Sequence, residues 1–282
     1  MKIPLESLGD VIKHALAEDV PNGDPTTEVL IPPDVAGSAV MVCKQAGVLA
    51  GLGTAADVFR LVDAELDIEL VPLEGKLIEP GTVVLNVRGS LASILKAERT
   101  ALNFVQRLSG IATLTRRYVD AVSGTKTKIL DTRKTTPGLR FFEKHAVRMG
   151  GGQNHRLNLS DGVLIKDNHI AAAQMQGLSL ADMVRKAREQ TQGKLKIEIE
   201  IENLDQLREV LEGKPDVVML DNMDVDTMRQ AVEITQGRAL LEASGGVTLK
   251  TVRAIAETGV DFISVGALTH SAPALDLSLD FA

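Results

Sequence analysis

The sequence predicts an α/β protein whose larger part is a barrel of parallel strands. Six short apolar runs recur after residue 124, and each ends on a polar residue or glycine before a helical pattern begins. Five of these terminators are 34, 21, 23 and 22 residues apart, the length of one strand–helix unit: Lys166, Glu200, Asp221, Ser244 and Gly266. Near-continuous apolar strands imply a parallel sheet covered on both faces. Six units favour a barrel, and a doubly wound open sheet is the alternative because the sequence does not reveal strand order.

The residues before this repeat have a different pattern. Leucine, isoleucine and valine recur at helical spacing over 5–18, and a turn-forming stretch, PNGDPTTE, follows at 21–28. Residues 36–89 have the pattern of strands, with Glu-Gly and Pro-Gly turns between them. The first part of the chain is therefore expected to contain a helix and then a sheet.

A long helical pattern begins near Ser90, and Ser109–Gly110 is its expected interruption. We predict a domain boundary there, with an N-terminal domain over 1–108 and the barrel over 109–271. The tail, 272–282, alternates apolar and polar residues, so we expect one more strand that returns to the N-terminal domain.

Composition argues against several classes of protein. Aromatic residues make up 2% of the chain and tryptophan is absent, so stacking platforms for single-stranded nucleic acid are nearly excluded. No apolar run has the length of a membrane span. The single cysteine, Cys43, cannot form an intrachain disulfide, and the chain begins without an apolar signal segment. We expect a cytoplasmic protein that binds neither nucleic acid nor membrane.

Charge is distributed unevenly along the chain. Residues 126–170 hold nine Lys or Arg and four acids, a net charge of +5, whereas the whole chain carries −7. The remainder therefore sums to −12 and would repel a nucleic-acid backbone over most of its surface. A local positive region in an acidic protein suits a small, highly charged anion.

The ends of the apolar runs carry the candidate chemistry. Because the carboxyl ends of barrel strands open onto one face, these residues should meet in space. Glu200 and Asp221 are neighbouring carboxylates that could hold Mg²⁺ or the hydroxyls of a sugar. Glu198 and Glu202 share the face of Glu200, so periodicity does not choose among the three; Glu200 is chosen by its position and by the family resemblance described below. Several cations in adjacent segments imply a polyanionic ligand or two anions: Arg133, Lys134, His155, Arg156 and Lys166.

Two glycine-containing loops are candidates for phosphate binding. SGGV (244–247) and VGAL (265–268) follow the last two runs, where small residues let backbone N–H groups approach a phosphate. Tight turns are the simpler explanation of either loop alone. Three further cations at helical spacing, Arg140, Lys144 and Arg148, fit solvated surface charges.

Other functions remain open from the residues alone. Lys166 could form a Schiff base, as the strand-end lysines of barrel aldolases do. A non-catalytic protein that binds a phosphosugar would need the same loops. The histidines lack the spacing of a zinc site.

In combination, the motifs resemble those of one family. The segments ILDTRKTTPGLR, KHAVRMGGGQNHR, LIKDNHI, VMLDN, EASGGV and SVGALTHS occur in this order, and the chain resembles the quinolinate phosphoribosyltransferase family over 16–271. The resemblance implies an incomplete TIM-like α/β barrel with an N-terminal α/β sandwich domain, assembled as a homodimer or a hexamer of dimers. A molybdenum-transport-associated homologue shares this fold, and the unbroken TRKTTPGLR and GGGQNHR segments argue against it.

The resemblance also implies a reaction, that of a carboxylating nicotinate-nucleotide diphosphorylase. Quinolinate and 5-phosphoribosyl 1-pyrophosphate (PRPP) give nicotinate mononucleotide, pyrophosphate and CO₂ in de novo NAD biosynthesis. The family's substrate-binding positions correspond here to Arg99, Thr132, Arg133, Lys134, His155, Arg156, Lys166, Glu200, Asp221, Ser244, Gly245, Gly246, Val265, Gly266 and Ala267.

Roles within this set follow from the same resemblance. Lys134, Lys166, Glu200 and Asp221 are the expected catalytic residues. Glu200 and Asp221 would also face the Mg²⁺ that binds with PRPP. Arg99 would reach the site of the neighbouring subunit, so that a complete pocket needs a dimer.

Overall fold

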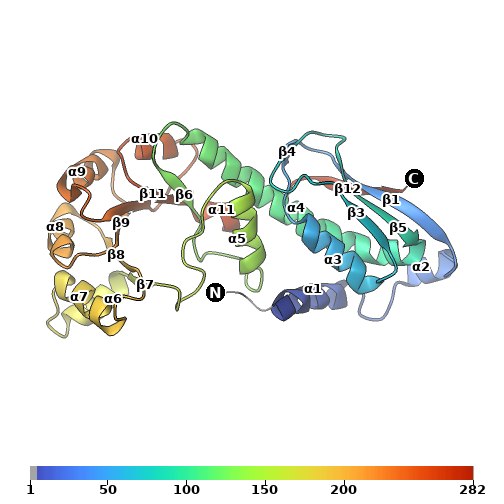
Figure 1. Ribbon diagram of the computed structural model, residues 1–282, viewed down its shortest axis with the longest axis horizontal. Helices are drawn as coiled ribbons and strands as arrows, with labels where there is room; N and C mark the ends of the chain where they lie inside the picture. Colours follow the sequence, from blue (N-terminus) through green and yellow to red (C-terminus); the bar gives the residue numbers. More distant parts are fainter. Residues whose placement is uncertain (1–4, 282) are drawn as a thin grey trace. The chain divides into compact units, whose positions relative to one another are not determined.

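The structure, a computed structural model, describes residues 5–281 and divides into two compact units. The first unit comprises Met1–Arg116, Thr135–Gly151 and Ser271–Ala282, and the second comprises Arg117–Lys134 and Gly152–His270. Figure 1 shows the helices and strands of both. The boundary predicted at 108/109 falls inside α4 (Leu91–Ala121), a helix that contributes residues to both units.

The first unit is built on an antiparallel sheet with strand order β12-β1-β5-β3. The tail contributes β12, which pairs with β1 along five residues from Ala39–Phe281 to Cys43–Leu277. The elements of this unit besides α4 are α1 (Leu5–Asp19), α2 (Pro25–Leu30), β1 (Ala36–Cys43), β2 (Gly47–Val48), α3 (Leu52–Val62), β3 (Asp67–Leu70), β4 (Leu77–Ile78), β5 (Val83–Ser90), α5 (Arg140–Met149) and β12 (Leu277–Phe281).

Two sequence predictions for the first unit were incomplete. The stretch predicted as a turn contains the short helix α2, which begins where the Asp24 side chain accepts hydrogen bonds from the N–H groups of Thr26 and Thr27. The region predicted as strands over 36–89 is divided by α3, whose alanines, Val58 and Phe59 bury one face of the helix.

The predicted interruption of the long helix at Ser109–Gly110 was wrong. Helix α4 continues through 31 residues without a break. Gly110 instead allows a close approach, because a Cβ atom there would overlap the carbonyl oxygen of Pro273. A glycine inside the helical pattern marked a packing contact and not a helix end.

The second unit is an open barrel of six parallel strands with order β6-β11-β10-β9-β8-β7. Its elements are β6 (Lys128–Leu130), β7 (Val163–Ile165), α6 (Asp167–Gln174), α7 (Leu180–Gln190), β8 (Ile197–Ile201), α8 (Leu204–Glu212), β9 (Val217–Asp221), α9 (Val225–Thr235), β10 (Leu240–Ser244), α10 (Val252–Ala256), β11 (Phe262–Ser264) and α11 (Ala267–His270).

Strand order decides between the two predicted architectures. The strands from β7 to β11 are neighbours in chain order, and the first strand, β6, pairs with the last, β11. A doubly wound sheet would instead reverse its order at a switch point. Within residues 5–281, β6 has no strand partner besides β11, and a single isolated bridge, Leu130–Gln153, adds to its pairing. The prediction of an incomplete barrel is therefore confirmed.

Side chains fix where the barrel helices begin. Ser179, Asn203 and Asp224 accept hydrogen bonds from the backbone N–H groups three residues further on, at 3.1, 2.9 and 2.8 Å. Each such cap stabilises a helix by about 1 kcal/mol. Because each cap closely follows a strand or a helix end, the connections stay short.

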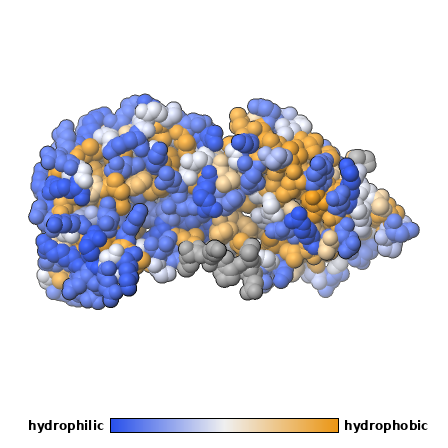
Figure 2. Space-filling model, in the orientation of Figure 1, coloured by the Kyte–Doolittle hydropathy of each residue, from blue (hydrophilic) through white to orange (hydrophobic). Residues whose placement is uncertain are grey.

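The interior and the surface differ in character. Neighbouring strands contribute fully buried aliphatic side chains to the barrel, among them Ile199, Val218, Ala243 and Ile263. Figure 2 shows hydrophilic residues spread over the visible face of the second unit and apolar residues gathered on that of the first. Within residues 5–281, none of the helices combines the length and the apolar character that crossing a membrane requires.

Candidate functional site

The carboxyl ends of the barrel strands bring together three residues that the sequence places far apart. Lys166 follows β7, Glu200 lies near the end of β8, and Asp221 ends β9. The Nζ atom of Lys166 lies 3.3 Å from Oε2 of Glu200. Asp221 is in register with Ser244 on the next strand. The predicted convergence of strand ends is therefore present in the fold.

Glu200 is much less exposed than its partner Lys166. Its side chain is 13% exposed, whereas that of Lys166 is 45% exposed. Burial raises the pKa of Glu200 above its usual value, Lys166 opposes this shift, and the charges of Asp221 and Asp167 add to it. A second cation here, such as a metal ion, would hold both carboxylates ionised.

The two glycine loops follow β10 and β11, the strands that come after β9 in the sheet. Gly245 has φ +95°, and a Cβ atom there would clash with the side-chain oxygen of Asn222, so only glycine fits. At Gly266, a Cβ atom would lie 3.2 Å from Cδ of Lys134. The side chain of Lys134 therefore runs along the loop that follows β11. This arrangement joins a cation to exposed backbone, as a phosphate site requires.

Two threonine hydroxyl groups fix the backbone of Lys134 through hydrogen bonds to its N–H and its carbonyl. Its N–H donates to Oγ1 of Thr132 at 3.0 Å, and its carbonyl accepts from Oγ1 of Thr269 at 2.7 Å. Thr132 thus acts on the position of Lys134 through the backbone. The lysine side chain itself remains exposed to solvent.

Two arginines lie deeper than the lysines. Arg133 and Arg156 are half-buried, and Nη1 of Arg156 donates to the carbonyl of Gly162 at 3.0 Å. Burial lowers the pKa of Arg156, the neighbouring charge of Arg133 lowers it further, and the carboxylate of Glu198 opposes both. The two guanidinium groups are thus close enough to repel each other, which favours an anion between them.

A buried acidic group lies beside the arginines; Glu198 was named only as an alternative to Glu200, and the sequence predictions missed Glu242 and Asp131. Nε2 of His155 lies 3.0 Å from Oε2 of Glu198 and 3.6 Å from Oε2 of Glu242. Asp131, which is fully buried, accepts from Nδ2 of Asn154 and from the N–H of His155. An acid within an otherwise apolar strand, LLEAS, was the available signal for Glu242.

Three other cations considered in the sequence belong to the first unit: Arg99, Lys144 and Arg148. Arg99 is exposed on α4 in the first unit, whereas the other predicted site residues belong to the second unit. Arg148 is exposed, as predicted for a surface charge. The same prediction was wrong for Lys144, which is only 2% exposed, because α5 turns that side chain inward.

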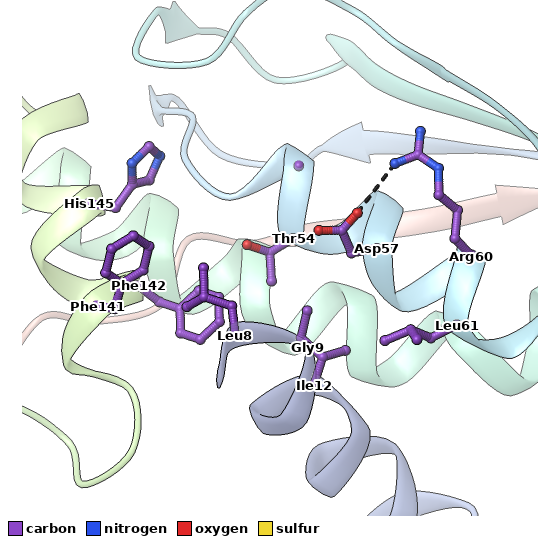
Figure 3. Close-up of a pocket in the computed structure, with 11 residues that line it drawn as sticks. Leu8, Gly9, Ile12, Thr54, Asp57, Arg60, Leu61, Phe141, Phe142 and His145 are labelled. Atoms are coloured by element: carbon purple, nitrogen blue, oxygen red, sulfur yellow. Dashed lines mark hydrogen bonds and ion pairs between the residues drawn. The ribbon is translucent and has the colours of Figure 1, made fainter. Parts of the chain in front are cut away.

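The first unit contains a separate pocket of about 450 Å³, shown in Figure 3. It lies among α1, α3 and α5 and is lined largely by apolar side chains, including Ile12, Leu61 and Phe142. Its one arginine, Arg60, forms an ion pair with Asp57 at 3.3 Å. This pocket lacks the group of cations that an anionic substrate needs.

Fold and site together define the class of protein. The second unit is a parallel α/β barrel with paired carboxylates, lysines, arginines and glycine loops at the carboxyl ends of its strands. Such a site suits a phosphorylated, polyanionic substrate.

Comparisons with known proteins identify the family. The models of the N-terminal and C-terminal domains of quinolinate phosphoribosyl transferase match residues 24–109 and 111–280. The chain is 47% identical to a probable nicotinate-nucleotide pyrophosphorylase [carboxylating] of Synechocystis over 95% of this chain and 90% of the relative. It is 42% identical to the protein of that name from Bacillus subtilis, over 97% and 93% of the two chains.

Solved structures agree with this result. The nicotinate-nucleotide pyrophosphorylase of Francisella tularensis superimposes with a TM-score of 0.92 at 40% identity, covering 100% of this chain and 98% of that one. NadC from Streptococcus pyogenes gives 0.93 at 40% identity, covering 100% and 99%. The chain belongs to the quinolinate phosphoribosyl transferase family.

Proposed function

We propose that this protein transfers the phosphoribosyl group of PRPP to quinolinate and releases nicotinate mononucleotide, pyrophosphate and CO₂, a step of NAD biosynthesis. Family membership supports this reaction. The observation that carries it at the level of the site is the Lys166–Glu200 pair beside Asp221, at the strand ends where barrel enzymes bind substrates.

Quinolinate presents two adjacent carboxylates, which match the cations of the second unit. Arg133 and Arg156 offer planar guanidinium groups for the carboxylates, and Lys166 adds a point charge. His155 lies beside the arginines, but both of its ring nitrogens already have partners within the chain. The direct contacts to the carboxylates therefore fall to the arginines and the lysine.

PRPP would bind along the neighbouring strand ends. The backbone of Ser244–Gly246 and of Val265–Ala267 would hold its 5-phosphate, and Lys134 lies beside the second loop to meet the pyrophosphate. Glu200 and Asp221 fit Mg²⁺, since their oxygens are hard ligands and two carboxylates lie at adjacent strand ends. When bound, Mg²⁺ would neutralise pyrophosphate charge.

The chemistry needs positioning and electrostatics more than a protein nucleophile. The ring nitrogen of quinolinate forms a bond to C1 of the ribose as the bond to pyrophosphate breaks, and Lys134 and Lys166 stabilise the departing charge. The carboxylates complement the cationic sugar. When the adjacent C–C bond then breaks and CO₂ leaves, the electron pair stays on the ring carbon, where the positive charge of the ribosylated nitrogen stabilises it, and that carbon takes a proton.

A Schiff-base mechanism at Lys166 is not favoured. A lysine of that kind is activated by desolvation or by another cation. The Lys166 side chain is nearly half exposed and forms an ion pair with a carboxylate. These features suit a lysine that binds and stabilises anions.

We further propose that the site is completed in a dimer by Arg99 of a second copy, with a hexamer of dimers as the larger assembly. Arg99 is an exposed cation on a unit separate from the other site residues. The same unit exposes several large apolar side chains, which suit contact between copies: Val29, Leu30, Leu61, Leu70 and Leu77. A cytoplasmic location also remains a prediction.

One assay tests the proposed reaction. The purified protein is incubated with quinolinate, PRPP and Mg²⁺, and nicotinate mononucleotide and CO₂ are measured. Both products should appear in equal amounts, and nicotinate should not replace quinolinate. No product, or equal turnover of nicotinate, would overturn the proposal.

A further inference from the structure

The residue after Asp221 makes the two oxygens of that carboxylate different from each other. Nδ2 of Asn222 donates a hydrogen bond to Oδ2 of Asp221 at 2.8 Å. An ionised carboxylate only accepts hydrogen bonds, so the nitrogen of the amide must be the atom that faces it. The other oxygen, Oδ1, has no hydrogen-bond partner among residues 5–281. One oxygen of Asp221 is therefore held within the protein, and the other can meet a ligand.

We propose that Asn222 is a positioning residue for PRPP binding, whose amide holds Oδ2 of Asp221 so that Oδ1 is the oxygen that meets the Mg²⁺ bound with PRPP. The inference rests on the proposed function and deepens it, because Asn222 is outside the set of predicted site residues. Asn222 acts through Asp221, so we do not count it as a catalytic residue.

The backbone of Asn222 is the first reason to assign it a role in binding. Its φ is +53°, in the left-handed region that non-glycine residues rarely adopt. Three other non-glycine residues of the described chain share this region, and each closes the end of a helix: Gln192, Lys214 and Gln236. Asn222 instead directly follows a strand, β9, at the face of the barrel where substrates bind. Unusual backbone conformations of this kind are concentrated at ligand sites.

The same conformation restricts which residue can do this. Glycine, asparagine and aspartate tolerate the left-handed region best. Glycine has no side chain, and an ionised aspartate cannot donate a hydrogen bond. Of these three residues, only asparagine provides a donor for the carboxylate of Asp221.

The loop after β10 fixes the side chain of Asn222. The N–H group of Asn222 donates to the carbonyl of Ser244 at 2.9 Å. A Cβ atom on Gly245 would lie 2.6 Å from Cγ of Asn222 and 3.0 Å from its backbone nitrogen. The asparagine side chain therefore lies directly against Gly245. Packing on this side limits its rotamers, so the amide is already oriented toward Asp221 before a ligand binds.

Asp221 has a physical need for such a partner. Its charge contributes to the raised pKa of Glu200, so the two carboxylates repel each other. Mg²⁺ demands nearly ideal octahedral geometry, and a ligand that turns away from a like charge would meet this demand poorly. Hydrogen bonds to ligating carboxylates provide the orientation, and losing one such partner lowers metal affinity or activity by about 10- to 100-fold.

The test measures PRPP binding by isothermal titration calorimetry without quinolinate, once in Mg²⁺ and once in EDTA. It compares the wild type with Asn222→Gly, which keeps the left-handed backbone and removes the amide. In Mg²⁺ the Kd of the variant should be about 10- to 100-fold higher than that of the wild type. In EDTA the two proteins should differ much less, because the amide acts through the metal ligand.

Two results would overturn the proposal. One is an unchanged Kd for Asn222→Gly in Mg²⁺. The other is an equal loss of affinity in Mg²⁺ and in EDTA, which would mean that Asn222 supports only the fold of the Gly245 loop.

Gln236→Gly is the matched control. It also removes an amide side chain from a left-handed position, but at the end of α9 and away from Asp221. Its Kd for PRPP should equal that of the wild type in both solutions. Glycine adopts the left-handed region freely, so both variants should melt close to the wild-type temperature. A comparable loss of Mg²⁺-dependent affinity in Gln236→Gly would overturn the specific role of Asn222.

Kinetics with quinolinate separate this inference from the proposed reaction. In Asn222→Gly, KM for PRPP should rise while KM for quinolinate stays at the wild-type value. A wild-type protein that binds PRPP as expected but forms no nicotinate mononucleotide would reject the reaction and leave the role of Asn222 standing. Normal turnover in the wild type together with an unchanged KM for PRPP in Asn222→Gly would reject only the role of Asn222.

Discussion

Nζ of Lys166 lies 3.3 Å from Oε2 of Glu200, and this contact joins the carboxyl ends of β7 and β8. Because the lysine is nearly half exposed, the pair adds little to stability. The ion pair matters because it fixes the positions of the Lys166 ammonium group and the Glu200 carboxylate at the site.

Replacing Lys166 should therefore affect catalysis far more than folding. We expect Lys166→Gln to lower kcat/KM by about 10²- to 10³-fold, the usual cost of losing one stabilising group in a transition state. The melting temperature should change little. Lys194→Gln removes an exposed lysine elsewhere and is the control. Steady-state kinetics with full activity in Lys166→Gln would contradict the role of this lysine.

Mixed dimers test the role of Arg99. Arg99→Ala and Arg133→Ala should each be nearly inactive alone. If Arg99 serves the partner's site, random re-association of equal amounts forms one intact site in half of the dimers, and about a quarter of wild-type activity returns. If Arg99 serves its own subunit, no mixed dimer has an intact site. Activity after exchange, with exchange verified by native mass spectrometry, separates the two.

The glycine loop after β10 offers a matched pair of substitutions. Gly245→Ala introduces a side chain at φ +95° and against Asn222, so we expect a loss of about 1–3 kcal/mol in stability and a higher KM for PRPP. Gly246→Ala has φ +58° and nothing within 4 Å of the added Cβ, so its cost in stability should be smaller. Chemical denaturation and KM measurements compare them, and an equal effect would contradict the close approach at Gly245.

The buried acid Glu242 should make stability depend on pH. Its pKa is raised to about 8 in the folded protein, so the folded state binds more protons than the unfolded state between the ordinary glutamate value and 8. The stabilisation is fully present below that ordinary value and is lost as pH rises through 8. The free energy of unfolding of the wild type should fall over this range relative to that of Glu242→Gln. Denaturation at pH 6 and pH 9 measures the difference, and a constant difference would contradict it.

Some features of the fold could be predicted because they depend on local pattern. The six apolar runs became the six parallel strands, since a strand covered on both faces must be apolar along its length. The terminators Lys166, Glu200 and Asp221 could be predicted as neighbours because parallel strands expose their carboxyl ends on one face.

Other features depend on contacts between distant segments. Gly110 resembled a helix break, but it faces the backbone of Pro273, which no local pattern indicates. Lys144 has the spacing of a surface charge, yet the packing of α5 buries it. Glu242 and Glu198 were not predicted as a pair, because 44 residues separate strands that lie two places apart in the sheet.

The sequence by itself determined the barrel class, the period of its units, the group of cations near its strand ends and the resemblance to one family. These follow from residue type and spacing, which act over a few residues. Tertiary structure alone decided that β6 pairs with β11 and that His155 lies against two buried acids. The reason is physical: desolvation and charge repulsion depend on which groups the fold encloses together, and that is a property of three-dimensional distance.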